Sequence, residues 1–324
     1  MAMRPSLIVL DDYTRSSEHL ADWSRLVQPP HELSLRVLTR PVPPSELVET
    51  LKPYTMIHAM RERTILTRET LAQLPNLKFI TTTALKNRGI DLEACRDFGI
   101  VVSGTESRGN GASGTVEQTW ALILSLSRRI VTEDADVRGG GWQTGLAVGL
   151  HGKQIGLIGL GRLGTQVAHV ARAFGMRVVA WSPNLTRERA QDAGVELAQS
   201  LDELLTTSDV VSLHIVLSER TRGLLGKKEL ALLKPTAFLI NTSRGPLVDE
   251  NALIEVLQSR RIAGAGLDVF DVEPLPEDHA LRVLDNVVRS PHMGYVEESQ
   301  YGDWMEQTVA NVEAFLAGTP VRLL

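Results

Sequence analysis

The chain of 324 residues contains one cysteine, Cys95, which excludes an internal disulfide and a cysteine-cluster metal site. Its eight histidines lack the spacing of metal ligands, and no HExxH motif occurs. No long basic run appears and the net charge is −5, which argues against non-specific binding to nucleic acid. No run of about eighteen apolar residues and no apolar signal-peptide core occur. We therefore expect a cytoplasmic, metal-independent protein that does not bind a membrane.

The composition is that of a globular protein, with 43% apolar and 23% charged residues. The length is sufficient for two domains that each bury a core. Short β-branched runs such as "SLIVLDD" and "LKFITTT" alternate with amphipathic stretches such as "SELVETLK". This alternation is typical of βαβ units, so we predict an α/β fold with parallel sheets and helices on both faces.

A Gly/Ser-rich link, "SGTESRGNGASGT", separates two series of such units. After it, residues 115–138 predict one long helix, capped by Gly114 or Thr115 and ended by the glycines of "RGGGW". The second series runs from "KQIGLIGLGRLG" to "DNVVRSPH". The last segment, "ESQYGDWMEQTVANVEAFLAG", predicts a helix closed by Gly318.

A glycine motif opens the second series. Gly159, Gly161 and Gly164 form GxGxxG between the apolar run "QIGLIGL" and the helical "TQVAHVARAF". Such glycines permit a tight turn, close approach of the backbone to a pyrophosphate and close helix–strand packing. The alternative is a merely structural turn, but the strand–turn–helix context favours binding of a dinucleotide.

The next strand, "MRVVAW", ends where an acidic residue would bind the adenosine ribose. Ser182 takes that place, eighteen residues after Gly164, and no acid follows before Glu188. Without a carboxylate the repulsion that excludes a 2′-phosphate is absent. Ser182 and Asn184 can bond a hydroxyl or a phosphate, while Arg187 either pairs with the phosphate or solvates the next helix. The predicted cofactor is NAD or NADP.

Polar residues follow three later strands. Arg244 follows "TAFLIN", Asp268 and Glu273 lie in "GLDVFDVEP", and His292 follows "NVVRSP". Ligands of open α/β sheets bind beyond the carboxyl ends of the strands, so we expect these residues near the nicotinamide. Each alone could be a cap, a surface acid or a core residue, but their joint placement behind a dinucleotide motif favours a catalytic site.

The segments "GKQIGLIGLGRLG", "INTSRGPLVDENAL", "GLDVFDVEP" and "SPHMG" resemble the D-isomer-specific 2-hydroxyacid dehydrogenases in order and spacing. The resemblance is strong over 115–295. It implies two doubly wound parallel-sheet domains, with a Rossmann-type cofactor domain of 109–295 inserted into a smaller flavodoxin-like substrate domain. That second domain comprises 1–108, completed by 296–324. It further implies a cleft for a small anionic substrate, and a homodimer formed through the long helix and the "RGGGWQTG" segment.

The resemblance also implies an oxidoreductase that transfers a hydride between NAD(P) and a small D-2-hydroxy or 2-keto acid, with Arg244, Glu273 and His292 as catalytic triad. His292 would supply the proton, Glu273 would favour its imidazolium form, and Arg244 would bind the substrate carboxylate. The residues predicted to bind the cofactor are Gly159, Gly161, Arg162, Leu163, Gly164, Ser182, Asn184, Thr221, Thr242 and Asp268. His214 is interpreted as structural or cofactor-adjacent, and Val216 stands where the family usually has proline.

The substrate loop departs from the family. In "TTTALKNRGID", Ala84-Leu85-Lys86 replaces a small Gly-x-Gly whose N–H groups bind the substrate carboxylate in the family. This predicts a loop without the same backbone freedom. Leu85 and Lys86 are the predicted substrate contacts, although the default expectation for a lone lysine such as Lys86 is that it points to solvent. Leu85 and Trp304 are candidates to shape an apolar pocket.

Two other functions share these motifs. One is an NAD(H)-sensing binding protein of the kind represented by the C-terminal binding protein corepressors. The other is a dehydrogenase of the phosphite or formate type, which the residues Arg244, Glu273 and His292 do not distinguish from a keto-acid reductase.

Overall fold

The computed structural model describes residues 4–106 and 113–324. The chain divides into two compact units, which we call the N-terminal unit (1–111 together with 297–324) and the central unit (112–296). Within the described ranges, no helix combines the length and apolar character needed to cross a membrane.

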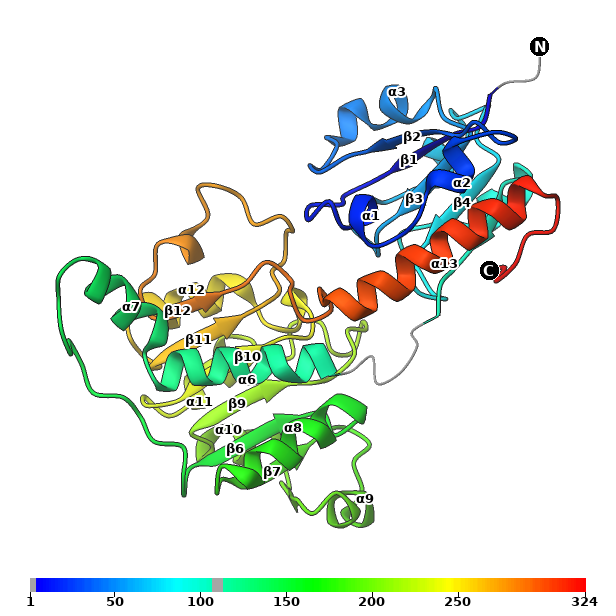
Figure 1. Ribbon diagram of the computed structural model, residues 1–324. Coiled ribbons are helices and arrows are strands. Elements are labelled where there is room, and N and C mark those ends of the chain that lie inside the picture. The colour runs from blue at the N-terminus through cyan, green and yellow to red at the C-terminus, as the bar shows by residue number, and fades with distance from the viewer. Residues whose placement is uncertain (1–3, 107–112) are drawn as a thin grey trace. The chain divides into compact units, whose positions relative to one another are not determined.

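The N-terminal unit is built on a five-stranded sheet in which every strand pair is parallel. Its strand order is β2-β1-β3-β4-β5 (Figure 1), which is the flavodoxin-like order. This confirms the predicted fold of the unit. The strands are β1 (Ser6–Val9), β2 (Ser34–Val37), β3 (Met56–Ala59), β4 (Phe79–Thr82) and β5 (Val101–Ser103).

Helices cover both faces of this sheet because alternate strand residues point to opposite sides. Ile8 and Ile80 pack in one core cluster, beneath the helices of 44–97, while Leu7 and Phe79 pack in the other. Those helices are α3 (Leu47–Leu51), α4 (Arg68–Leu71) and α5 (Leu92–Asp97), with a short 3₁₀ turn at Pro44–Glu46. The opposite face is covered by α1 (Ser16–His19), α2 (Ser24–Val27) and the C-terminal helix α13 (Glu298–Leu316).

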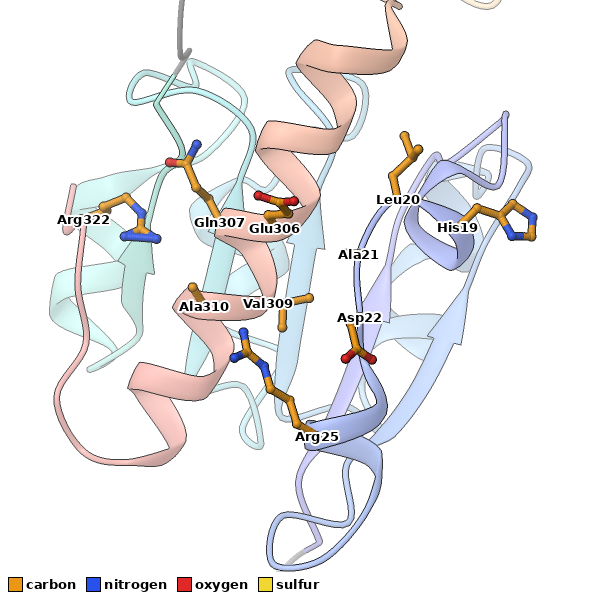
Figure 2. Close-up of a pocket in the computed structure, with 10 residues that line it drawn as sticks. All are labelled: His19, Leu20, Ala21, Asp22, Arg25, Glu306, Gln307, Val309, Ala310 and Arg322. Carbon is orange, nitrogen blue, oxygen red and sulfur yellow. The ribbon is translucent and has the colours of Figure 1, made fainter.

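The helix α13 completes the N-terminal unit. Phe315 stacks on Phe79 of β4 with 4.5 Å between ring centroids. The helix ends at Leu316, and Gly318, two residues later, has a φ of 77°, which confirms the predicted stop. Figure 2 shows a hollow beside α13, between the C-terminal tail carrying Arg322 and the segment carrying His19 and Arg25. None of the predicted site residues lines this hollow.

The central unit is built on a seven-stranded parallel sheet of order β12-β11-β10-β9-β6-β7-β8. The strand order reverses at the β6–β9 pair, which is the switch point where dinucleotides bind in Rossmann-type sheets. The strands are β6 (Gln154–Ile158), β7 (Arg177–Trp181), β8 (Glu196–Leu197), β9 (Val210–Leu213), β10 (Phe238–Asn241), β11 (Gly264–Leu267) and β12 (Val287–Arg289).

Two hydrophobic clusters flank this sheet. One packs beneath α10 (Leu201–Thr207), α11 (Lys227–Leu232) and α12 (Glu250–Gln258). The other packs beneath α6 (Ser113–Ser127) and α8 (Arg162–Ala173). The remaining elements are α7 (Ile130–Arg138), α9 (Arg187–Asp192) and the 3₁₀ turns Gly245–Leu247 and Ala280–Arg282.

The predicted single helix over 115–138 is wrong. It is two helices, α6 and α7, separated at Arg129, whose φ is 58°. Its start is also earlier than predicted, because α6 already includes Gly114 and Thr115. The break is held by one local contact and one contact with a later segment. Arg129 Nε donates to Glu133 Oε1 at 3.0 Å, and Val148 N donates to the Ser127 carbonyl at 2.7 Å. The predicted end at the "RGGGW" glycines is confirmed, since α7 ends at Arg138.

Candidate active site

The central pair of the candidate site is His292 and Glu273, from the loops after β12 and β11. His292 Nδ1 lies 2.6 Å from Glu273 Oε2. The other carboxylate oxygen accepts a hydrogen bond from the Phe270 N–H at 2.9 Å. Both side chains are reachable from solvent, with 25% of His292 and 34% of Glu273 exposed. The imidazole is therefore oriented by a carboxylate that the backbone itself holds.

Arg244 lies close enough for its charge to act on this pair. Burial raises the pKa of Glu273, but the hydrogen bond with His292, the charge of His292, the hydrogen bond from the Phe270 N–H and the charge of Arg244 together outweigh it. The pKa of the carboxyl consequently ends below its ordinary value, and Glu273 is an ionised acceptor near neutral pH. Arg244 follows β10, and its carbonyl accepts from Asn241 Nδ2 at 2.9 Å. The structure thus brings together the three predicted catalytic residues.

Asp268 has a role that the sequence prediction did not contain. Its carboxylate is fully buried and accepts from Ser290 Oγ at 2.5 Å, Met293 N at 2.7 Å and Gly294 N at 2.8 Å. Burial raises the pKa of Asp268 in spite of these bonds. Both oxygens accept hydrogen bonds from the loop of His292, so the carboxylate acts on the site by holding that loop. Its predicted contact with the nicotinamide stays a prediction.

The glycine turn has the shape that the motif predicts. Gly159 has a φ of 105°, and a Cβ there would overlap the His214 carbonyl. A Cβ at Gly164 would overlap the Gly159 carbonyl, whereas Gly161 faces open space. The helix α8 begins at the exposed Arg162 and the half-buried Leu163, and it has no side-chain cap. Its first N–H groups are available to an anion, so the turn fits a dinucleotide pyrophosphate.

His214 lies against this turn through its carbonyl. Its Nε2 lies 2.9 Å from Ser212 Oγ, and burial lowers the pKa of the imidazole to about 4. The ring is therefore neutral near pH 7. These contacts agree with a structural role of His214, and its adjacency to the cofactor stays a prediction.

The tip of β7 presents neutral and cationic groups. Ser182 is half-buried, and Asn184 and Arg187 are exposed. Thr186 Oγ1 accepts from Arg189 N at 3.3 Å and so caps α9. The first carboxylate after the strand belongs to Glu188, inside that helix. A ribose or its phosphate would meet hydroxyl, amide and guanidinium groups here.

Two predicted cofactor contacts, Thr221 and Thr242, are buried and hydrogen-bonded within the protein. Thr221 Oγ1 donates to the Val216 carbonyl at 2.7 Å and accepts from Ser218 N at 2.8 Å. Thr242 Oγ1 lies 2.8 Å from Thr119 Oγ1 of α6. The two hydroxyls shape loops beside the turn, and their contact with the cofactor stays a prediction.

The substrate loop, in the N-terminal unit, corrects one expectation. Ala84 has a φ of 76°, so the loop takes a left-handed backbone without glycine. Its N–H donates to Thr105 Oγ1 at 2.9 Å, and a Cβ on Gly104 would lie only 2.6 Å from the Ala84 carbonyl. The glycine that the loop requires is therefore Gly104, on the neighbouring segment, which the sequence analysis missed. Lys86 is exposed, as is 46% of Leu85.

Trp304 is a candidate to shape an apolar pocket, and that role stays a prediction. Its side chain is buried, with Tyr301 at 5.6 Å between ring centroids and the Arg61 guanidinium at 5.9 Å from its ring. The indole belongs to the packing between α13 and the loop after β3.

Sequence reasoning also missed a second imidazole–carboxylate pair. His279 Nε2 lies 3.0 Å from Glu250 Oε1, and Glu250 Oε2 accepts from Asp271 N at 3.3 Å. The pair ties the loop that carries Glu273 to the start of α12. Nothing in the spacing of these residues could have indicated it. Among the residues that the structure describes, no three His, Cys, Asp or Glu side chains gather as metal ligands would.

Comparisons with known proteins identify the family. Residues 120–294 match the family model described as D-isomer specific 2-hydroxyacid dehydrogenase, NAD binding domain. A glyoxylate reductase of Aeropyrum pernix is 40% identical over 257 residues, covering 76% of each chain. A D-3-phosphoglycerate dehydrogenase of Methanocaldococcus jannaschii is 37% identical over 79% of this chain, which spans only 48% of that longer relative.

A solved structure of similar fold extends the match to both units. The crystal structure of a phosphoglycerate oxidoreductase from Vibrio cholerae superposes with a TM-score of 0.88 at 32% identity, over 98% of this chain and 100% of that one. The family match covers the glycine turn and the loops of Arg244, Glu273 and His292. The chain belongs to the D-isomer-specific 2-hydroxyacid dehydrogenase family.

Proposed function

We propose that the protein is an NAD(P)-dependent D-2-hydroxyacid dehydrogenase that interconverts a small 2-keto acid and the corresponding D-2-hydroxy acid. The observation that carries the proposal is the 2.6 Å pair of His292 and Glu273, beside Arg244 and on the sheet that bears the glycine turn. The central unit would be the cofactor domain, and the N-terminal unit would be the substrate domain. The similarity to a glyoxylate reductase supports this substrate class.

The bound cofactor would supply or accept the hydride. The residues of the chain account for the proton and the charge. With Nδ1 of His292 bonded to Glu273, Nε2 is the nitrogen that can donate to the substrate carbonyl oxygen. In reduction the carbonyl carbon gains the hydride, the oxygen gains the proton of His292, and a hydroxyl forms. Glu273 stabilises the imidazolium before the transfer, and Arg244 binds the carboxylate of the substrate.

A panel of substrates tests the proposal. Glyoxylate, pyruvate, hydroxypyruvate and its phosphate are assayed with NADH and NADPH, with phosphite and formate assayed with the oxidised cofactors. We expect turnover of at least one keto acid, with a D-hydroxy acid as product. Cofactor binding without any turnover would indicate a sensor protein instead. Turnover of phosphite or formate alone would assign the chain to that type of dehydrogenase.

We infer that NADP is accepted beside NAD, because Ser182 stands where a carboxylate would repel the 2′-phosphate. Ser182→Asp is expected to raise the preference for NADH over NADPH by about 10-fold or more, the equivalent of about 1.4 kcal/mol of repulsion. The measurement is the ratio of kcat/KM for the two cofactors. Gln191→Glu, which adds the same charge at the far end of α9, is the control. An equal loss with both cofactors would show that the tip of β7 is not the ribose site.

We also propose a homodimer formed through α7 and the segment that follows it. Figure 1 shows this segment looping out from the central unit before β6. Five large apolar side chains here are more than half exposed: Ile130, Val131, Val137, Trp142 and Leu146. We call these five residues the arm surface. Apolar exposure of this kind is typical of an interface.

The double variant Trp142→Glu, Leu146→Glu is expected to convert a dimer into a monomer, because it places two charges in the arm surface. The two side chains are 77% and 96% exposed, so the fold of the unit itself should tolerate the change. Sedimentation equilibrium measures the mass. Val283→Glu, at an 83% exposed apolar residue outside the arm, should leave the mass unchanged. A dimer that persists in the double variant would place the interface elsewhere.

A further inference from the structure

We propose that the first two turns of α6 brace the two loops that carry the catalytic groups. Gln118 and Thr115 would be positioning residues for His292, and Thr119 would be the positioning residue for the loop of Arg244. The inference rests on the proposed roles of His292 and Arg244. It explains why α6, which is apolar through its middle, carries the polar side chains of Thr115, Gln118 and Thr119.

The loop of His292 is tied to α6 on both sides of the imidazole. Before it, Gln118 Nε2 donates to Ser290 Oγ at 2.7 Å. After it, Thr115 Oγ1 donates to the Gly294 carbonyl at 2.7 Å. Each contact lies two residues from His292. A shift of α6 along its axis would therefore displace both ends of the loop.

The contact of Gln118 also fixes the direction of a buried hydrogen-bond chain. A serine hydroxyl has one hydrogen to donate. Because Ser290 Oγ accepts from the Gln118 amide, its own hydrogen is available to Asp268 Oδ1, 2.5 Å away. Asp268 in turn holds the N–H groups of Met293 and Gly294. The chain Gln118–Ser290–Asp268 thus ends on the backbone next to the catalytic imidazole.

The loop needs this restraint because its backbone is strained. His292 has a φ of 54°, in the left-handed region. That region is unfavourable for a residue other than glycine, so it persists only where surrounding contacts enforce it. The N–H of His292 is held by the Asp268 carbonyl at 2.8 Å. Together with α6, Asp268 holds the imidazole in a conformation that the free loop would leave.

The second loop is tied to the same helix. Thr119 Oγ1 donates to the Thr115 carbonyl at 2.8 Å, which leaves the hydroxyl of Thr242 as the donor in their 2.8 Å contact. Thr242 lies two residues before Arg244. The loops of His292, the proposed proton donor, and of Arg244, the proposed carboxylate-binding cation, are therefore both held by α6.

The helix α6 packs closely on the sheet, so its position, and with it the position of the two loops, is fixed. The helix packs across β10, β11 and β12 (Figure 1). Gly264 and Gly266 of β11 face it, and a Cβ on Gly266 would lie 3.0 Å from the Leu122 Cβ. Because Gly264 and Gly266 have no Cβ, the helix can approach this side of the strand closely.

The test replaces the amide of Gln118. Gln118→Met keeps the length of the side chain and removes the donor. We expect kcat to fall about 10- to 100-fold, the effect of a displacement of about 1 Å in a catalytic group, while the Kd of the cofactor stays within about twofold. Glu117→Gln, at the exposed neighbouring position, is the matched control and should change neither quantity.

A charged variant separates positioning from general stability. Gln118→Glu offers Ser290 an acceptor when ionised and a donor when protonated. Its kcat relative to the wild type should therefore be low at neutral pH and recover as the pH falls. A merely structural role of Gln118 predicts no such recovery. A ratio that stays constant with pH would overturn the proposal.

Hydrogen exchange gives a readout that does not depend on activity. Exchange of the Met293 and Gly294 amides should be faster in Gln118→Met than in the wild type. If Gln118→Met does not fold, Thr115→Val, which removes only the donor to Gly294, takes its place. Wild-type kcat together with unchanged exchange would overturn the brace. A wild type that reduces no keto acid would overturn the proposed function, and hydrogen exchange would still decide on the brace.

Discussion

His292→Ala is expected to lower kcat by about 10²- to 10⁴-fold, the usual contribution of a positioned general acid. The imidazole is the group that Glu273 orients at 2.6 Å. Because the glycine turn at 159–164 does not depend on the imidazole, the Kd of NADH should change by less than about twofold. The loss would thus fall on the chemical step, and not on binding of the cofactor.

The measurement is steady-state turnover of the best keto acid, with cofactor binding followed by fluorescence. His169→Ala, which removes an exposed histidine from α8 of the same unit, is the control for the loss of an imidazole. Glu273→Gln should give a smaller decrease, because it keeps a hydrogen-bonding partner for His292 and removes only the charge. Turnover of His292→Ala within about twofold of the wild type would remove His292 from the mechanism.

Stability of the N-terminal unit is expected to fall steeply as the pH is lowered from about 6.5 to about 4. His58 of β3 is fully buried, and burial lowers its pKa from 6.5 to about 4 despite the charge of Asp12. In this window the unfolded chain binds a proton that the folded chain does not. The free energy of unfolding is therefore highest above the pKa that His58 has in the unfolded chain, and it decreases as the pH falls below that value. The decrease reaches up to about 3 kcal/mol at 1.4 kcal/mol per pKa unit.

Urea titrations between pH 7 and pH 4 measure this slope. His58→Gln cannot titrate at this position. The slope of its unfolding free energy against pH should therefore correspond to about one proton fewer taken up on unfolding. His19→Gln, at an exposed position of α1, should retain the slope of the wild type. Hydrogen bonds from Ser16 and Ser17 outweigh burial and lower the pKa of Asp12, so that carboxylate acts only at lower pH. Parallel curves for the wild type and His58→Gln would show that another group causes the acid sensitivity.

The fold class and the gathering of the candidate catalytic residues follow from the sequence for one physical reason. Alternating β-branched runs and amphipathic stretches specify parallel strands, and parallel strands bring their carboxyl ends to one edge. Arg244, Glu273 and His292 each follow a strand, and in the structure they meet at that edge. Their positions follow from the order of parallel strands in the sheet, and the alternation of strand and helix patterns in the sequence predicts such a sheet.

Features that depend on tertiary contacts could not be predicted. The break at Arg129 depends on the returning segment, where Val148 donates to the Ser127 carbonyl, which no local propensity reveals. The left-handed Ala84 depends on Gly104, twenty residues later. The contacts of α6 required knowing how the helix is rotated on the sheet, since Gln118 and Thr119 sit among apolar residues that show no clear stripe.

The contact between Leu126 of α6 and Gly266 couples two positions that lie far apart in the sequence. A Cβ at 266 would lie only 3.2 Å from Leu126 Cδ1, so added volume at 266 favours a shorter side chain at 126. A homologue with alanine at the position of Gly266 should accordingly carry a smaller residue opposite. The pair would then appear as size-compensating covariation between a helix and a strand, which no pattern within either element would display.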